Sequence, residues 1–548
     1  MYARICLLLA GLVISSCSAD YAAISERKPV FQPIRSTGRA LVSFQQKIAH
    51  AAKADPALSL GDYLAAAQEA EQRLKSHPED QDARDSYNFA VARVFSAFRE
   101  TGKAPWSQPL EVPTAEGAYQ LTYRREHQDR RLWNPALYDF LPADEIEMKG
   151  LYVEKHVTRG GLGAPLVAVG KDNDKAARAN FGMDKIYYGV TALLDFTGRN
   201  CVITFLDPLE NEEVRLDGRS HPLAADFTTP LAVMLARSNP KGMELPRLLR
   251  PQKYAETARV SRIQPYDPNK TVVLVIHGLK DSPATWAPMI NSLWADKEIR
   301  TNYQFWFYSY PSGYPYPYSA AILRKELDAA EKRFSLKHKM VVIGHSMGGC
   351  ISRLLITDAD EKLWMDYFGK KPSQVSLTPQ TKRLVEESLI FDHRSEIGRV
   401  IFISAPLKGS DLASGWPGRI GSWLIKAPFT LINVGNEAFK AVVTTGDSLK
   451  VNGMPNSVDT LAPNNRFVME INKLPLAPGI PYHTIMGDRG KGGNHDKTRP
   501  VQSDGIVPYW SSHMAGAESE LVVPSSHSAH QNEQAMEEVE RILRLHQN

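Results

Sequence analysis

The sequence has no long run of like charge and no excess of glycine or proline. Lys and Arg together number 65 and Asp and Glu 61, so the formal net charge is +4 over 548 residues. Proteins dedicated to nucleic acids usually carry a basic stripe or patch, so the charge argues against nucleic acid as a partner. Gly and Pro, at 36 each, lie near average usage, which excludes collagen-like and mostly disordered chains. The length allows several domains with cores of their own.

Cysteine is also scarce. The chain has four, Cys6, Cys17, Cys201 and Cys350, and the first two lie at the extreme N-terminus. The other two lie in apolar segments, where cysteine behaves as a small hydrophobic residue. We therefore expect two buried free thiols rather than a disulfide.

An apolar run covers residues 5–14, but it is too short to span a bilayer on its own. Arg4 precedes the run, and the small residues Ser15 and Ser16 lead from it into Cys17. A basic residue, a short apolar run and small residues at the cleavage site are the layout of a secretory signal peptide.

Residues 14–17 also resemble the lipobox of bacterial lipoproteins. The resemblance implies that residues 1–16 are a signal peptide and that Cys17 is acylated, which would anchor the chain to a membrane of the bacterial cell envelope. Ser18 stands where the inner-membrane retention signal of that family would be Asp, and this favours the outer membrane. The alternative is a plain signal peptide that is cut at another small residue.

Composition and periodicity change along the mature chain. Apolar residues recur at helical spacing between 60 and 75 and again between 87 and 98, whereas short strand-like runs separated by turn residues follow between 110 and 262. The predicted order is a tether at 17–55, a helical hairpin at 56–108, a β-rich extension at 109–262 and a catalytic domain at 263–548.

The last segment alternates strands and helices. Its first strand, TVVLVI at 271–276, is unbroken and apolar, as in a parallel strand that is buried on both faces. This alternation predicts an α/β fold with a mostly parallel, doubly wound sheet and helices on both faces. Functional residues in such sheets collect at the carboxyl ends of the strands. Further strands are expected at 304–308, 340–343, 400–404, 483–486 and 521–523.

The sequence GHSMG at 344–348 follows one of these strands and opens a helix. A G-x-S-x-G motif in this position forms a tight turn that exposes the serine hydroxyl. Gly344 and Gly348 remove the side chains that would clash at the turn. Ser346 is therefore the candidate nucleophile.

When a serine attacks a carbonyl group, the tetrahedral intermediate carries an oxyanion, and two N–H donors are needed to stabilise it. In this chain order one comes from the residue after the nucleophile, Met347, and the other from the loop after an earlier strand. The sequence HGL at 277–279 ends such a strand, and Leu279 is the candidate second donor. We expect His277 to support this loop rather than to act as the base, because the base comes late in this chain order.

The acid and the base should follow the nucleophile in the order Asp, then His. Asp504 lies in a turn late in the chain, and His527 follows the last apolar strand. They are the candidate acid and base. Asp488 follows the strand expected at 483–486 and is the competing acid. His530 lies only three residues after His527 and is the competing base.

With these motifs, the chain from about 265 to 546 resembles an α/β-hydrolase of the bacterial lipase and esterase kind. The segments HGL, GHSMGG and SDGIVPYWSSH are similar to the oxyanion, nucleophile and acid segments of that family. By this resemblance Asp504 is the triad acid and His527 the base.

This chain differs from those lipases at a calcium-binding position and at a disulfide position. The family places a calcium-binding Asp two residues after the catalytic histidine, where this chain has Ala529, and a cysteine where this chain has Trp510. Neither feature is carried over, and we expect no metal and no cofactor.

The resemblance implies hydrolysis of carboxylic esters of lipids or acyl chains, although thioesterases, phospholipases and acyltransferases use the same triad. Insertions at about 360–396 and 407–480 lie where the fold builds caps. Within the second, Trp416, Ile420, Trp423 and Leu424 have helical spacing and fit either a lid or an ordinary packed helix. The rival class is a non-catalytic envelope lipoprotein that uses the fold and the hairpin as an interaction scaffold. The sequence identifies no protein partner.

Overall fold

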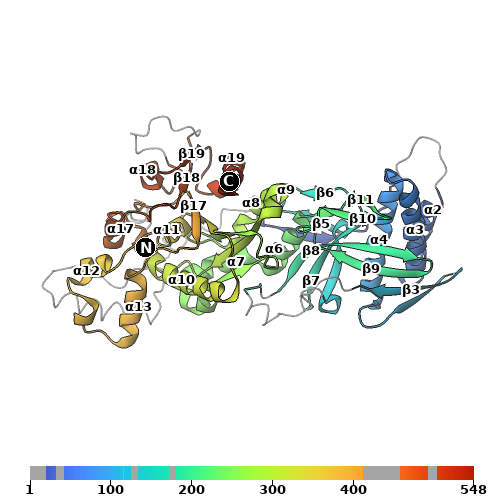
Figure 1. Cartoon of the computed structure of the whole chain (residues 1–548), viewed down its shortest axis with the longest axis horizontal. Helices are drawn as coiled ribbons and strands as arrows, with labels where there is room; N and C mark the ends of the chain where they lie inside the picture. The colour runs from blue at the N-terminus through green and yellow to red at the C-terminus, as the bar shows by residue number, and fades with distance from the viewer. Residues whose placement is uncertain are drawn as a thin grey trace, which may run out of the picture.

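The computed structural model describes residues 20–32, 42–114, 116–124, 134–171, 181–183, 185–410, 457–490 and 503–547. The signal peptide, Cys17 and the four apolar residues between 416 and 424 lie outside this part of the chain. Figure 1 shows an elongated molecule with the N-terminal helices at one end and the C-terminal sheet at the other. Among the described residues, no helix combines the length and apolar composition needed to cross a bilayer.

Three helices form the N-terminal end. They are α2 (Ser43–Ala51), α3 (Pro56–Ser76) and α4 (Gln81–Thr101). The Asp80 side chain caps α4 by accepting a hydrogen bond from the Ala83 amide, and Gly102 ends the helix in the left-handed conformation. Apolar faces of the three helices pack on the neighbouring sheet in one core that includes Leu64 and Phe95.

This neighbouring sheet has six strands in the order β2-β3-β9-β8-β7-β4. All of its pairs are antiparallel except β3 with β9. Alternate residues of its strands, such as Leu166 and Val190, face the helices. Cys201 lies in this core, and both it and Cys350 are buried free thiols, which confirms that expectation. The strands are β2 (Leu110–Thr114), β3 (Gly117–Tyr123), β4 (Tyr138–Pro142), β7 (Ala164–Gly170), β8 (Tyr187–Thr197) and β9 (Asn200–Leu206).

The second sheet has seven strands in the order β13-β15-β14-β16-β17-β18-β19. Apart from the antiparallel edge strand β13, all of its pairs are parallel. The strands are β13 (Arg259–Arg262), β14 (Thr271–Ile276), β15 (Tyr303–Ser309), β16 (Met340–His345), β17 (Ile397–Ile403), β18 (Tyr482–Gly487) and β19 (Ser519–Val523). The predicted boundary at 262/263 therefore divides this sheet, because β13 pairs with β15.

Helices cover both faces of the second sheet, as predicted. Val272 and Leu274 of β14 face a core that includes residues of α10 (Tyr316–Arg333) and α11 (Met347–Arg353). Val273 and Val275 face a second core, with residues of α8 (Ala287–Ala295) and α19 (Glu533–Gln547). Alternate residues of one strand thus enter two cores, which explains the unbroken apolar sequence of β14.

The predicted tether at 17–55 contains folded structure. Strand β1 (Ala23–Glu26) pairs with β5 (Ile146–Lys149), and α2 also begins within this segment. The Tyr21 ring stacks on Tyr152 with centroids 4.3 Å apart. These contacts join residues more than a hundred positions apart, so no local pattern in the sequence reports them.

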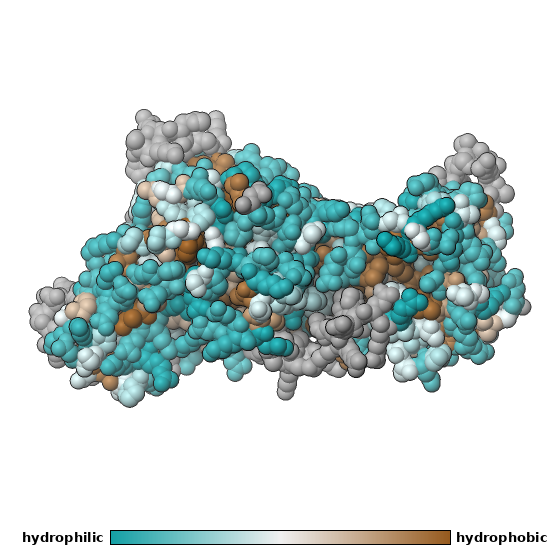
Figure 2. Space-filling view, in the orientation of Figure 1, coloured by the Kyte–Doolittle hydropathy of each residue, from teal (hydrophilic) through white to brown (hydrophobic). Residues whose placement is uncertain are grey.

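The first cap insertion contains two helices, α12 (Lys362–Phe368) and α13 (Pro379–Leu389). Of the second, the described part includes α17 (Arg466–Ile471). The face of the molecule in Figure 2 is mostly hydrophilic, with apolar residues in small scattered groups.

Candidate active site

Ser346 lies between the last residue of β16 and the first of α11. Its backbone has φ 54° and ψ −125°, and its amide donates to the Ile403 carbonyl at 2.9 Å. A non-glycine residue in this region of the Ramachandran map is strained. The turn holds the side chain at the carboxyl end of the sheet, where the motif predicts it.

The glycines around Ser346 are required by close backbone contacts. A Cβ on Gly344 would lie 2.3 Å from the Ser352 Oγ, and one on Gly348 would lie 2.2 Å from the Ile276 carbonyl oxygen. One on Gly278 would lie 2.9 Å from the Ser346 Cβ. The turn, the helix and the loop after β14 therefore pack together only because these positions have no side chain.

The structure brings Ser346, His527 and Asp504 into one line. The His527 Nε2 lies 2.8 Å from the Ser346 Oγ, and the Nδ1 lies 2.7 Å from the Asp504 Oδ2. A carboxylate only accepts hydrogen bonds, so the Nδ1 carries the proton and the Nε2 is free to accept from the serine hydroxyl. This is the arrangement in which a histidine can act as a general base towards a serine.

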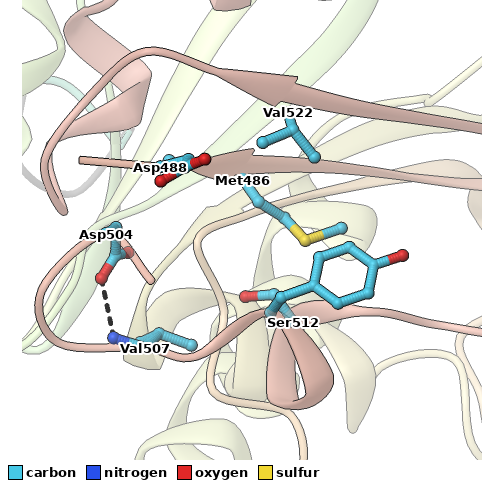
Figure 3. A pocket seen from close by; sticks show the side chains of 8 residues that line it. Met486, Asp488, Asp504, Val507, Ser512 and Val522 are labelled. Carbon is cyan, nitrogen blue, oxygen red and sulfur yellow. Dashed lines mark hydrogen bonds between the residues drawn. The ribbon is translucent and has the colours of Figure 1, made fainter. Parts of the chain in front are cut away.

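The Asp504 carboxylate is fixed by its own turn. Its Oδ1 accepts from the amides of Ile506 and Val507 at 2.8 and 2.7 Å, and Figure 3 shows the bond to Val507. Burial alone would raise the pKa of Asp504, but the hydrogen bond and charge of His527 and these two amides outweigh it and lower the pKa. Asp504 is therefore an anion that stabilises a protonated histidine.

Burial dominates the environment of the histidine itself. Burial lowers the pKa of His527 below the ordinary value, although the hydrogen bond that the ring donates to Asp504 acts in the opposite direction. The ring is consequently neutral at neutral pH, the state that a base needs.

The two competing residues lie elsewhere. The Asp488 Oδ1 accepts from the Gly490 amide at 2.7 Å, and Figure 3 places the Asp488 side chain across the pocket from Val507. His530 is 2% exposed, and its ring packs on Trp286 and His345 with centroids 4.8 and 4.1 Å apart. Within the described residues, neither side chain makes a hydrogen bond to Ser346.

One predicted oxyanion donor directly follows Ser346, and the other lies in the loop after β14, whose Gly278 packs on Ser346. Met347 is the first residue of α11, and Leu279 follows the loop glycine Gly278. Over the ranges that the structure describes, neither amide donates to a protein acceptor. Both are available to an oxyanion in that respect.

His277 supports the loop and does not contact the serine. Its Nε2 accepts from the Tyr310 amide at 3.3 Å, and the Tyr310 hydroxyl donates to the His277 carbonyl at 2.7 Å. Burial lowers the pKa of His277 to about 4. Its Nδ1 lies 2.9 Å from the Gly278 carbonyl oxygen, so the buried ring joins the loop after β14 to the segment after β15 and has a structural role.

Several residues behind the loops of Leu279, Ser346 and His527 are not among the site residues predicted from the sequence. Asp281, His345 and His530 are buried, and one ligand atom of each lies within 4.8 Å of the others, so this group is the metal-ligand candidate within the described chain. Glu244 of the N-terminal half lies next to the loop after β14. The Glu244 Oε1 accepts from the Tyr21 and Ser282 hydroxyls at 2.8 and 3.0 Å. The signals available in the sequence were an acid directly after HGLK and the histidine inside GHSMG.

Comparison with known proteins gives no sequence match. No family model matches the chain, and no curated protein does. Several solved structures are similar over about half of its length. The mature lipase BlEst2 of Bacillus licheniformis is 16% identical, with 52% of this chain and 98% of that chain covered and a TM-score of 0.33.

Two further structures give lower scores. The metagenomic carboxyl esterase MGS0156 is 14% identical, with 52% and 78% of the two chains covered and a TM-score of 0.28. The phospholipase PlaB from Legionella pneumophila is 15% identical, with 44% and 46% covered and a TM-score of 0.26. The strand order and the strained serine turn after β16 identify the fold. The C-terminal half has the α/β-hydrolase fold.

Proposed function

We propose that this protein is a serine hydrolase that cleaves carboxylic esters, in particular those of lipids or acyl chains, through an acyl-enzyme intermediate. The observation that carries the proposal is the hydrogen-bonded line from Ser346 through His527 to Asp504. These three residues follow the carboxyl ends of three parallel strands, which supports the same interpretation. The Met347 and Leu279 amides, which donate to no protein acceptor among the described residues, support it as well.

In the proposed reaction the Ser346 hydroxyl attacks the ester carbonyl while His527 accepts its proton. Asp504 keeps the imidazole in the required tautomer and stabilises the imidazolium. The amides of Met347 and Leu279 stabilise the oxyanion, each contributing about 3 kcal/mol if typical. His527 then returns the proton to the leaving alcohol. Water releases the acyl group by the same steps, with His527 as base again.

Replacement of the nucleophile tests the proposal. Ser346→Ala should abolish hydrolysis of p-nitrophenyl esters and labelling by a fluorophosphonate probe, because it removes the proposed nucleophile. Ser319→Ala is the control, since Ser319 is also buried but lies in α10 and is not part of the proposed triad. Retained hydrolysis in Ser346→Ala would refute the assignment, and an unlabelled wild-type protein would favour the scaffold alternative.

We further propose that the chain is a lipoprotein of the bacterial cell envelope, anchored in the outer membrane through acylated Cys17. The supporting observation is the run of residues 14–17 after a short apolar segment. Cys17→Ser should move the full-length protein from the membrane fraction to the soluble fraction and abolish incorporation of labelled palmitate. Cys6→Ser is the control and should change neither. Labelling of the Cys17→Ser protein at wild-type level would contradict the proposal.

A further inference from the structure

A large cavity lies between the N-terminal half and the edge of the seven-stranded sheet. Its volume is about 830 Å³, which is within the range of about 300 to 1,000 Å³ that is typical of small-molecule sites. Its walls are α6 (Thr228–Ser238), α7 (Pro240–Leu249), the 3-10 helix η3 (Pro251–Thr257), α8 and the edge strands β13 and β15. Figure 1 shows α6 and α7 between the two halves of the molecule. None of the described lining residues belongs to the proposed triad or is a proposed oxyanion donor, so the cavity is distinct from the candidate active site.

One part of the cavity wall is apolar. Leu231 of α6, Ile290 of α8 and Phe307 of β15 line it and belong to a single hydrophobic core, against which Met234 and Ile263 pack. Met234 and Ile263 are only half-buried. An alkyl chain in the cavity would remove their remaining apolar surface from water, which is favourable.

The wall becomes polar towards the carboxyl end of β15. Phe307 and Ser309 both line the cavity, and they lie on the same face of the strand, roughly 7 Å apart. In the neighbouring strand β13, Ser261 pairs with Phe307 and Arg259 pairs with Ser309. The cavity is therefore amphipathic, with an apolar part and a cationic part that follow one another along the same strand.

Arg247 of α7 adds a second guanidinium at the polar end. Its Nη1 donates to the Ser309 Oγ over a long 3.4 Å, and its buried Nε has no hydrogen-bond partner among the described residues. Glu244, one turn earlier in the helix, accepts from the hydroxyls of Tyr21 and Ser282 instead. Burial lowers the pKa of Arg247, but a guanidinium keeps its proton in proteins. Arg247 is thus a half-buried cation with hydrogen-bond donors left for an anion.

The charge of the whole cavity also favours an anion. Among the described lining residues, five are basic and one, Glu256, is acidic. The complete chain is nearly balanced, with 65 Lys and Arg against 61 Asp and Glu, so the excess is local to this wall. A concave surface with charges of one sign raises the local concentration of ligands of the opposite sign. The basic residues are Lys185, Arg237, Arg247, Lys253 and Arg259.

We propose that this cavity is a second binding site, which takes a single-chain amphiphile with an anionic head group. The alkyl chain lies against Met234 and Ile263, and the head group accepts hydrogen bonds from Arg247 beside Ser309. A cavity of this volume accommodates one molecule of drug size, hence one alkyl chain. The proposal goes beyond the proposed function, because this binding requires neither Ser346 nor turnover.

The test measures binding to the full-length protein by isothermal titration calorimetry. The anionic probes are decanoate and decyl phosphate, and 1-decanol and decyltrimethylammonium are the neutral and cationic probes with the same chain length. Both anions should bind at least tenfold more tightly than the other two probes, because only they accept from Arg247. Tighter binding of decanoate would identify fatty acids as the source of the ligand, and tighter binding of decyl phosphate would identify phosphate-headed lipids.

Two replacements separate the head group from the chain. Arg247→Met should weaken binding of both anions by about ten- to a hundredfold, the size of effect that a hydrogen bond to a charged group produces. Arg250→Met is the matched control, since Arg250 is the exposed residue that follows α7 and does not line the cavity. It should leave both affinities unchanged. Met234→Trp fills the apolar part of the cavity and should weaken binding of all probes.

A decanoate analogue with a diazirine at its terminal carbon maps the site. Mass spectrometry should find the label in peptides of α6, α8 or β15. Affinities that are unchanged in Arg247→Met, or anions that bind no more tightly than 1-decanol, would overturn the proposal. So would a label confined to the peptides of Ser346 and His527, because binding would then belong to the candidate active site. If Arg247→Met does not fold, the label and Met234→Trp decide. A wild-type protein without ester hydrolysis would refute the proposed function and leave this test unaffected.

Discussion

The two large sheets differ in strand direction, and this difference determines where side chains from several loops can lie close together. In the six-stranded sheet most pairs are antiparallel, so successive strands end at opposite edges. In the seven-stranded sheet six strands run parallel, so the loops that follow them meet at one edge. Ser346 follows β16, Asp504 lies between β18 and β19, and His527 follows β19. The parallel sheet thus brings together residues that are far apart in sequence.

The antiparallel sheet uses its residues differently. Its inward-facing side chains are apolar and pack against α3 and α4 in a single core. The connection between β8 and β9 is a tight turn at 198–199. Such a sheet supplies a stable face and short connections rather than a cluster of long loops.

The most direct test of the comparison removes one carboxylate from the edge of the parallel sheet where these loops meet. Asp504→Asn should lower kcat by about 10⁴-fold, because an amide in place of the carboxylate favours the wrong tautomer of His527. Asp488→Asn removes another carboxylate between β18 and β19 and is the control. Steady-state hydrolysis of a p-nitrophenyl ester measures both. Equal losses in the two variants would contradict the assignment of Asp504 as the acid.

A mutation in the core of the six-stranded sheet should have a smaller effect on activity. Phe95→Ala opens a cavity in the core between α4 and the six-stranded sheet, where Phe95 packs against Phe140 and Phe205. It should lower the free energy of unfolding of that half by about 3 to 5 kcal/mol. The rate of fluorophosphonate labelling of Ser346 should stay at the wild-type value where the protein is folded, because these contacts do not reach the catalytic loops.

Phe402→Ala is the matched variant in the parallel sheet. Phe402 is equally buried and pairs in register with Gly344, two residues before the nucleophile. Here the loss of stability should be accompanied by slower labelling of Ser346. Denaturant unfolding gives the stability of both variants. Equally slow labelling in Phe95→Ala would show that the two halves act as one unit.

The fold of the C-terminal half could be predicted because its signals are local. The apolar sequence of β14 and the glycines around Ser346 report burial and tight packing directly. The positions of Asp504 and His527 could be proposed from their order in the chain, and the structure places both beside Ser346. Whether Leu279 and Met347 stabilise an oxyanion remains a prediction, as do the domain limits.

Other features depend on contacts between distant segments. Strand β1 is short and has an ordinary sequence, and only its pairing with β5 distinguishes it from a tether. β13 belongs to the second sheet because β15 lies beside it. Asp281 lies near His345 because the loop after β14 packs against the end of β16. Such information is absent from any window of the sequence.

The docking of the N-terminal segment limits how far the folded protein can move from its anchor. The carbonyls of Asp20 and Tyr21 accept from the amides of Leu151 and Tyr152, so these two residues are held on the folded body. Only three peptide units (20 − 17) separate Cys17 from Asp20, and an extended chain advances at most about 3.6 Å per residue. An acylated Cys17 would therefore keep the folded body within about 11 Å of the lipid headgroups. The enzyme would then search for its substrate in two dimensions, and the amount of substrate in the bilayer rather than its solubility in water would set the rate of encounter.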